Sequence, residues 1–135
     1  AGVAASGYST TLLIGDLAFQ HDISGLLATL EDDLSLTIIV LDDQGGGIFS
    51  YLPISEVADP ALFKEFFTTT QQLPIRKVVE AVGIAYFEIT EISDLSHILE
   101  KPDRLRVVRI PVDPDLDVDQ HRRIAQAVSN SLSEL

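Results

Sequence analysis

Residues 11–53 read TLLIGDLAFQHDISGLLATLEDDLSLTIIVLDDQGGGIFSYLP. Two short runs in this stretch, Thr11–Ile14 and Leu36–Leu41, consist of Leu, Ile, Val and Thr without polar alternation. Because the strands of a parallel sheet are covered on both faces, such runs predict two strands buried on both sides. Between them, Asp22 can cap a helix whose apolar stripe is formed by Ile23, Leu26, Leu27 and Leu30. The stretch therefore predicts a strand–helix–strand unit with parallel strands.

The remainder of the chain continues this alternation of helix and strand. We expect the end of a helix in residues 1–9, a loop over 51–59, helices over 60–67, 75–82 and 91–99, and strands over 84–89 and 105–112. A turn is expected at Lys101-Pro102-Asp103, and a last helix that Asp119 caps. The acidic segment 113–119 lacks the central Gly and closing Glu of a calcium loop, so we interpret it as a turn before that helix. The pattern predicts an α/β domain, doubly wound, with a mainly parallel sheet and helices on both faces.

Acidic, glycine-rich turns follow both strands of the 11–53 stretch. Gly15-Asp16 follows the first strand, and residues 42–47 (DDQGGG) follow the second. Parallel sheets bind ligands at the carboxyl ends of their strands, so Asp16 and Asp43, 43 − 16 = 27 residues apart, would lie within reach of one ion. Two carboxylates and a turn carbonyl, completed by water and phosphate oxygens, suit Mg²⁺. The pattern outlines a metal–diphosphate site; the alternative is that both acids only cap helices or stabilise turns.

These residues resemble the cofactor-binding motif of thiamine diphosphate enzymes, which begins Gly-Asp and closes on Asn-Asn. The segments GDLAFQHDISGLL and LTIIVLDDQGGGIFSYLP make the resemblance more specific. They resemble the 2-succinyl-5-enolpyruvyl-6-hydroxy-3-cyclohexene-1-carboxylate synthases of menaquinone biosynthesis, in which Gly-Asp-Leu replaces Gly-Asp-Gly and Gly-Gly-x-Ile-Phe follows the amide pair. The close match covers roughly residues 10–53. The tail fits only in length and pattern.

The resemblance assigns roles to individual residues. It implies ligands for Mg²⁺ (or Mn²⁺) at Asp16, Asp43 and the carbonyl of Gly45. It implies contacts to the cofactor at Gly15, Asp16, Leu17, Ala18, Gly45 and Ile48. It places Ile48, Phe49 and Leu52 beside the substrate, with ordinary core packing as the alternative for these three.

The chain departs from the family pattern at two places. Asp42-Asp43 stands where the family has Asn-Asn, and Ala18 stands where many relatives carry Ser or Thr. An Asp oxygen serves Mg²⁺ as well as an Asn oxygen does, but the added charge repels a diphosphate. The substitution therefore bears directly on cofactor affinity.

The resemblance also implies a function. It indicates the thiamine diphosphate domain of a carboligase that decarboxylates 2-oxoglutarate and adds the succinyl-semialdehyde unit to isochorismate. The Glu that activates the cofactor belongs, in this family, to an upstream pyrimidine-binding domain, usually of a second subunit of a homo-oligomer. We therefore expect residues 1–135 to be the C-terminal, diphosphate-binding domain of a longer enzyme, with no catalytic residue of its own. Alone, it should bind the cofactor weakly and turn over nothing.

Composition bounds these expectations. The formal net charge of −12 argues against a nucleic-acid partner, because phosphates would be repelled. A strongly acidic protein that binds a diphosphate needs a cation such as Mg²⁺ to mediate. No apolar run of about 18 residues and no basic-apolar signal segment is found, so we expect a cytoplasmic protein without a membrane span.

Three alternatives stay open at this stage. Within the class, the chain could belong to another thiamine diphosphate enzyme, such as a relative of acetolactate synthase. A Mg²⁺-binding receiver domain would need an acid pair after its first strand, whereas here the pair follows the second. A non-catalytic interaction domain would explain the Phe-rich segment 62–67 but not the spacing of the acids. We interpret His21 and the cations Arg104, Arg106 and Arg109 as structural or charge-pairing rather than catalytic.

Overall fold

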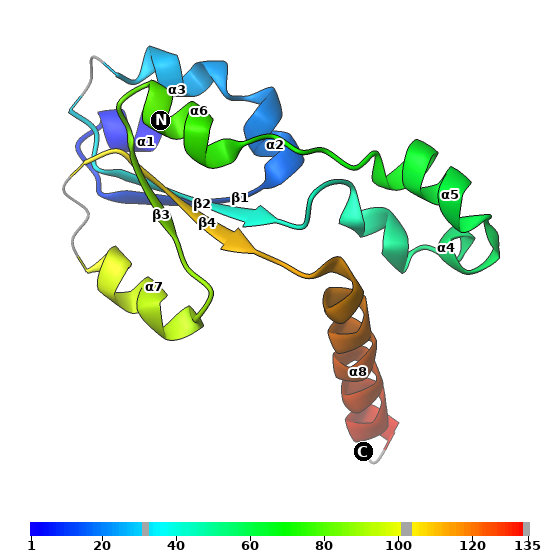
Figure 1. The fold of residues 1–135 in the computed structure, drawn as a ribbon. Coiled ribbons are helices and arrows are strands. Elements are labelled where there is room, and N and C mark those ends of the chain that lie inside the picture. Colours follow the sequence, from blue (N-terminus) through cyan, green and yellow to red (C-terminus); the bar gives the residue numbers. More distant parts are fainter. Residues whose placement is uncertain (31–32, 101–103, 134–135) are drawn as a thin grey trace. The chain divides into compact units, whose positions relative to one another are not determined.

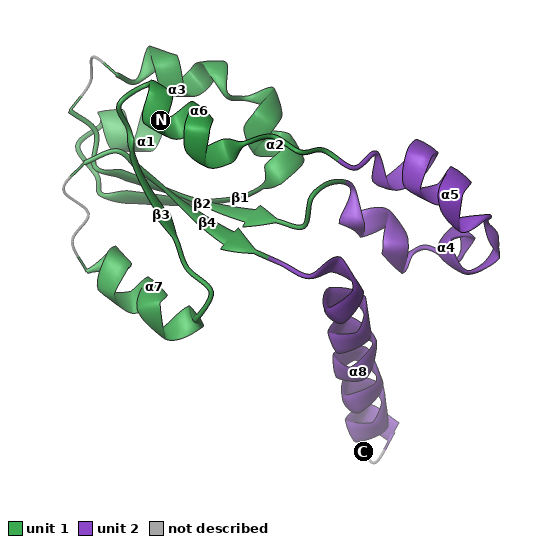
Figure 2. Cartoon of the chain, viewed as in Figure 1, with its two compact units in different colours: residues 1–45, 71–111 green, residues 46–70, 112–135 purple. Residues whose placement is uncertain are grey.

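A computed structural model describes residues 1–30, 33–100 and 104–133 of the chain. The chain divides into two compact units, coloured separately in Figure 2. Unit 1 contains residues 1–45 and 71–111, and unit 2 contains residues 46–70 and 112–135. The turn expected at residues 101–103 lies outside the described residues.

Unit 1 is built on a four-stranded sheet in the order β1-β2-β4-β3, in which every neighbouring pair is parallel (Figure 1). The strands are β1 (Thr10–Gly15), β2 (Leu36–Asp42), β3 (Ala85–Glu88) and β4 (Arg106–Pro111). All four strands expected from the sequence are present, within two residues at each end. The parallel α/β sheet is confirmed.

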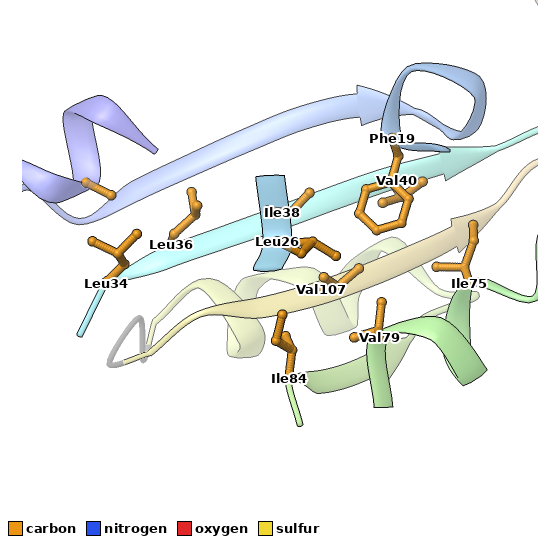
Figure 3. Close-up of a cluster of buried hydrophobic side chains, with 11 residues drawn as sticks. Phe19, Leu26, Leu34, Leu36, Ile38, Val40, Ile75, Val79, Ile84 and Val107 are labelled. Carbon is orange, nitrogen blue, oxygen red and sulfur yellow. The ribbon is translucent and has the colours of Figure 1, made fainter. Parts of the chain in front are cut away.

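Helices cover both faces of this sheet, as expected. On one face lie α2 (Asp16–His21), α3 (Ser24–Ala28) and α6 (Ile75–Ala81), and the short α1 (Gly2–Ala5) joins them through Ala4. Their apolar side chains pack on β2 and β4; Figure 3 shows Phe19, Leu26 and Val79 converging on Ile38, Val40 and Val107. On the other face, α7 (Ile92–Leu99) packs Leu95, Ile98 and Leu99 against Ile39, Ile89 and Val108.

The expectation of burial on both faces is right for β2 and wrong for β1. In β2 every residue except Leu41 is buried. In β1 the pattern is mostly exposed, and the side chain of Leu13 is 62% accessible. The physical reason is position: β1 is at the edge of the described sheet, and α7 packs against β2, β4 and Ile89, which follows β3.

The helix that follows β1 begins earlier than the sequence predicts. Helix α2 starts at Asp16, directly after β1, and Asp22 is the residue that ends it. The next helix, α3, has Ile23 at its N-cap without a side-chain cap, so the expected capping role of Asp22 is wrong. The glycine at 15 enters the helix with extended backbone angles (φ −79°, ψ 161°). Asp16, which was expected in a turn, is therefore the first residue of a helix.

Unit 2 contains short helices and one long one. These are the 3₁₀ helix η1 (Gly47–Tyr51), α4 (Ile54–Val57), α5 (Pro60–Phe63), the π-helix η2 (Lys64–Thr68) and α8 (Pro114–Ser133). The loop predicted over 51–59 is therefore wrong, since Pro53 caps a helical turn instead of ending regular structure. The last helix begins at Pro114 rather than after Asp119, because Asp113 accepts hydrogen bonds from the N–H groups of Asp115 and Leu116.

Side-chain contacts hold η1 within unit 2. The hydroxyl of Tyr51, in η1, is hydrogen-bonded to the carboxylate of Asp117 and, at 3.1 Å, to Nδ1 of His121, both in α8. The ring of Phe49 meets that of Phe67 edge-on, and Phe67 stacks on Phe63. None of the helices in the described part of the chain is long and apolar enough to cross a membrane.

Candidate functional site: acidic turns at the ends of β1 and β2

The register of the sheet brings the two acidic turns to one edge of unit 1. Gly15 at the end of β1 pairs with Leu41 near the end of β2, so the residues that follow each strand are neighbours. Asp16 and Asp42 are buried, each 7% accessible, and Asp43 is half-buried. The structure brings the expected pair, Asp16 and Asp43, together and adds Asp42 to it.

Asp16 is electrostatically strained in this setting. Burial, the largest cause, raises the pKa of its carboxyl from 3.8 to about 6. The hydrogen bond that Asp16 Oδ1 accepts from the N–H of Leu17, at 2.7 Å, opposes this rise. The neighbouring negative charges of Asp43 and Asp42 add to it, as does a side-chain hydrogen bond with Asp42. Carboxylates gathered in this way attract a cation.

The second acidic turn has a defined shape. Asp42 Oδ1 accepts a hydrogen bond from the N–H of Gln44 at 3.1 Å. The chain then passes through positive φ at Gln44 (64°) and Gly45 (150°), a conformation that glycine adopts without steric cost. The carbonyl of Gln44 accepts the N–H of Gln71 at 3.0 Å, which ties the turn to the segment before α6. The turn is thus pinned on both sides of Asp43.

Arg109 of β4 reaches this turn; the sequence indicated a charge-pairing role for it but not this partner. Arg109 Nε donates to Asp42 Oδ2 at 2.5 Å, and its Nη1 donates to Glu88 Oε2 at 2.9 Å. The hydroxyl of Tyr86 donates to the same Glu88 oxygen at 2.7 Å. The bonds from Tyr86 and Arg109 lower the pKa of Glu88, while burial and the bond to Glu88 raise the pKa of Tyr86 to about 12. The only sequence signal was the cluster of Arg residues flanking the last strand.

The residues expected to contact the cofactor or the substrate are placed in two groups. Leu17 and Ala18 lie in the first turn of α2, and the N–H of Leu17 is engaged by Asp16 in this structure. Ile48 and Phe49 lie within η1 of unit 2, and Leu52 is at the end of that helix. The Ile48 side chain is 72% accessible, so core packing does not account for it.

The other titratable candidates are structural or exposed. His21 is exposed at the end of α2. Arg106 is buried, and its Nε donates to Thr37 Oγ1 at 2.8 Å. Arg104 is exposed. These positions agree with the interpretation of these residues as structural or charge-pairing.

The oxygen donors at this edge fit a hard cation whose coordination shell is completed by a bound ligand. Within residues 1–30, 33–100 and 104–133, no three His, Cys, Asp or Glu side chains are arranged to hold a metal ion on their own. Asp16, Asp43 and the Gly45 carbonyl offer only oxygen atoms. Mg²⁺ prefers oxygen donors and retains water or phosphate oxygens in part of its shell. A magnesium-bound diphosphate is therefore chemically consistent with this turn.

Comparison with known proteins identifies the class to which this fold and site belong. The family model described as "Thiamine pyrophosphate enzyme, C-terminal TPP binding domain" matches residues 1–104. The chain belongs to this family. The match agrees with the parallel sheet, and it favours the thiamine diphosphate hypothesis over the receiver and interaction-domain alternatives.

The curated relatives are more specific. A protein of Lysinibacillus sphaericus is 38% identical over 127 residues, which cover 91% of this chain and 22% of that protein. One of Myxococcus xanthus is 33% identical over 133 residues, covering 97% of this chain and 23% of that protein. One of Pelodictyon phaeoclathratiforme is 48% identical over 80 residues, which cover 59% of this chain and 13% of that protein. All three are named 2-succinyl-5-enolpyruvyl-6-hydroxy-3-cyclohexene-1-carboxylate synthase. The chain spans about a fifth of the length of the first two.

Proposed function

We propose that residues 1–135 are the C-terminal, diphosphate-binding domain of a carboligase in menaquinone biosynthesis. The enzyme decarboxylates 2-oxoglutarate and adds the succinyl-semialdehyde unit to isochorismate. The observation that carries the proposal is the meeting of Asp16, Asp42 and Asp43 at the ends of neighbouring parallel strands, in a chain of the thiamine pyrophosphate family. The names of the relatives give the product, and the resemblance of residues 10–53 to that family implies the substrates.

The residues at the acidic turns have distinct tasks in this proposal. Asp16 and Asp43 bind Mg²⁺ (or Mn²⁺) through carboxylate oxygens, and Gly45 through its carbonyl. Gly15, Leu17 and Ala18 present backbone to the diphosphate. For Leu17 this requires its N–H to leave Asp16 Oδ1 when the carboxylate turns to the metal. Ile48, Phe49 and Leu52 line the reacting end of the cofactor and the substrate, where apolar side chains exclude water.

The proposal also covers what lies outside this chain. When bound, thiamine diphosphate supplies the electron sink that allows the carboxylate of a 2-keto acid to leave as CO₂. The group that activates the cofactor comes from an upstream pyrimidine-binding domain, on a second subunit of a homo-oligomer. The enzyme acts in the cytoplasm. Residues 1–135 alone are inactive.

The test is a substrate comparison with the protein at its natural length, Mg²⁺ and thiamine diphosphate. We expect 2-oxoglutarate to be consumed with isochorismate present, giving the carboligation product by mass spectrometry. Pyruvate, the substrate of an acetolactate-synthase-like enzyme, should give none. Asp16→Ala should abolish turnover. Preferential use of pyruvate, or turnover of 2-oxoglutarate by residues 1–135 alone, would contradict the proposal.

A further inference from the structure

The acid at position 42 poses an electrostatic problem for the proposed function. Family members close the cofactor motif on Asn-Asn, whereas this chain has Asp42-Asp43. Asp42 is 7% accessible and shares a hydrogen bond with Asp16. A third carboxylate beside two metal ligands would repel the incoming diphosphate, because like charges at short range repel each other more strongly in the shielded interior of a protein than in water. Something must offset this charge if the cofactor binds.

Arg109 is placed to offset it. Its Nε atom lies 2.5 Å from Asp42 Oδ2, and both side chains are largely shielded, with accessibilities of 23% and 10%. The other oxygen of the carboxylate, Asp42 Oδ1, accepts the N–H of Gln44. Both carboxylate oxygens of Asp42 therefore accept hydrogen bonds from N–H donors. The single oxygen of an Asn side chain could accept only at one of these two positions. Glu88 accepts a hydrogen bond from Nη1 of the guanidinium and another from the hydroxyl of Tyr86.

We propose that Arg109 is a positioning residue for the cofactor turn. It neutralises Asp42, so that this acid takes the structural place of the family's first Asn and leaves metal binding to Asp43. The proposal rests on the proposed function. Arg109 acts through Asp42 and not on the diphosphate, because its Nε and Nη1 atoms form ion pairs with the carboxylates of Asp42 and Glu88. The pair Glu88–Tyr86 fixes the orientation of the guanidinium.

A mutant cycle on affinity tests this role. The Kd of Mg²⁺–thiamine diphosphate is measured by calorimetry for the protein at its natural length, for Arg109→Gln, for Asp42→Asn and for the double variant. We expect Arg109→Gln to weaken binding about tenfold, which corresponds to about 1.4 kcal/mol. Asp42→Asn should bind at least as tightly as the wild type, because its amide oxygen can still accept the N–H of Gln44. The double variant should bind within about threefold of Asp42→Asn.

The controls separate this mechanism from a structural one. Arg122→Gln breaks an exposed Arg–carboxylate pair within unit 2 (Nη2 to Glu56 Oε1, 3.0 Å) and should leave the Kd unchanged. Arg109→Lys, which keeps the charge, should recover part of the affinity. A merely structural role would lower the melting temperature of Arg109→Gln and leave the Kd of the folded variant unchanged. The comparison of Asp42→Asn with the double variant remains decisive even where Arg109→Gln fails to fold.

The outcomes are distinguishable. Unchanged affinity in Arg109→Gln overturns the inference. So does a tenfold loss in the double variant relative to Asp42→Asn, because Arg109 would then act on the cofactor itself. A wild-type protein that binds no Mg²⁺–thiamine diphosphate at all overturns the proposed function, and the inference with it.

Discussion

Arg109 and Asp42 stand 67 residues apart in the sequence, and their side chains are joined by a 2.5 Å hydrogen bond between Nε and Oδ2. The contact exists because β4 lies beside β2 in the sheet, where Val40 pairs with Arg109. It links the turn that follows β2 to the end of β4. The same guanidinium reaches Glu88 on β3, so one side chain connects three strands at the edge where the acidic turns lie.

This pair should contribute measurably to stability. Arg109→Gln leaves a buried carboxylate with one donor fewer, and we expect a loss of about 1–2 kcal/mol in the free energy of unfolding at pH 7. Adding Asp42→Asn should recover part of that loss, because the uncompensated charge is gone. Urea unfolding of both single variants and the double variant measures the coupling. Strictly additive effects would show that the two side chains do not interact in solution.

Asp16 should make the metal-free protein less stable as pH rises. Its pKa is raised in the folded state from 3.8 to about 6, so the folded protein holds this proton more tightly than the unfolded chain does. The contribution is therefore fully present below pH 3.8 and is lost as pH rises through about 6. At most about 3 kcal/mol is involved, by the usual 1.4 kcal/mol for each tenfold change in acidity.

The measurement compares the wild type with Asp16→Asn, which cannot titrate. Urea unfolding in EDTA at pH 5 and pH 7.5 should show the variant gaining stability relative to the wild type at the higher pH. Mg²⁺ should then stabilise the wild type and not the variant. An equal difference between the two proteins at both pH values would show that the Asp16 carboxyl is not perturbed.

Gly46 should tolerate no side chain. A Cβ atom there would lie 2.9 Å from the Phe67 carbonyl oxygen and 3.0 Å from Cδ2 of Phe49. We expect Gly46→Ala to lose about 1–3 kcal/mol of stability through overpacking. The matched control is Gly25→Ala in α3, where the nearest atom, Oδ1 of Asp22, is 3.5 Å away. That change should be neutral or stabilising, by up to about 1 kcal/mol. Equal melting temperatures for the two variants would contradict the packing described for η1.

The core under α6 should be sensitive to the loss of methyl groups. Val79 is fully buried against the sheet, whereas Val3 in α1 is 62% accessible. Val79→Ala should cost about 2 kcal/mol, from lost burial and the cavity left behind. Val3→Ala, the same chemical change, should stay within about 0.5 kcal/mol. Thermal unfolding of both variants provides the test, and a similar loss in each would mean that α6 does not pack as described.

Local chemistry made much of the sheet predictable. The run from Leu36 to Leu41 is apolar except for Thr37, and it forms the buried strand β2 as expected. The edge position of β1 was not predictable, because its apolar residues resemble those of a central strand. The helix starts at Asp16 and Pro114 were missed because several acids near each could serve as caps, and the sequence does not rank them.

The site was predictable only in part. The spacing of Asp16 and Asp43 reflects the crossover between neighbouring strands, and the structure brings them together with Asp42. The partner of Asp42 was not predictable, since it depends on β4 rather than β3 lying next to β2. Strand order is a property of the whole sheet, and a run of residues such as LRVVRIPV carries no signal for it.

The central claim is that the acidic turns bind thiamine diphosphate through a divalent cation. Its most direct test is a calorimetric titration of thiamine diphosphate into the protein at its natural length, with Mg²⁺ and with EDTA, alongside Asp16→Ala. We predict saturable heat that requires Mg²⁺ and disappears in the variant while its folding is retained by circular dichroism. Binding that is equally strong in EDTA, or that survives unchanged in folded Asp16→Ala, would contradict the account.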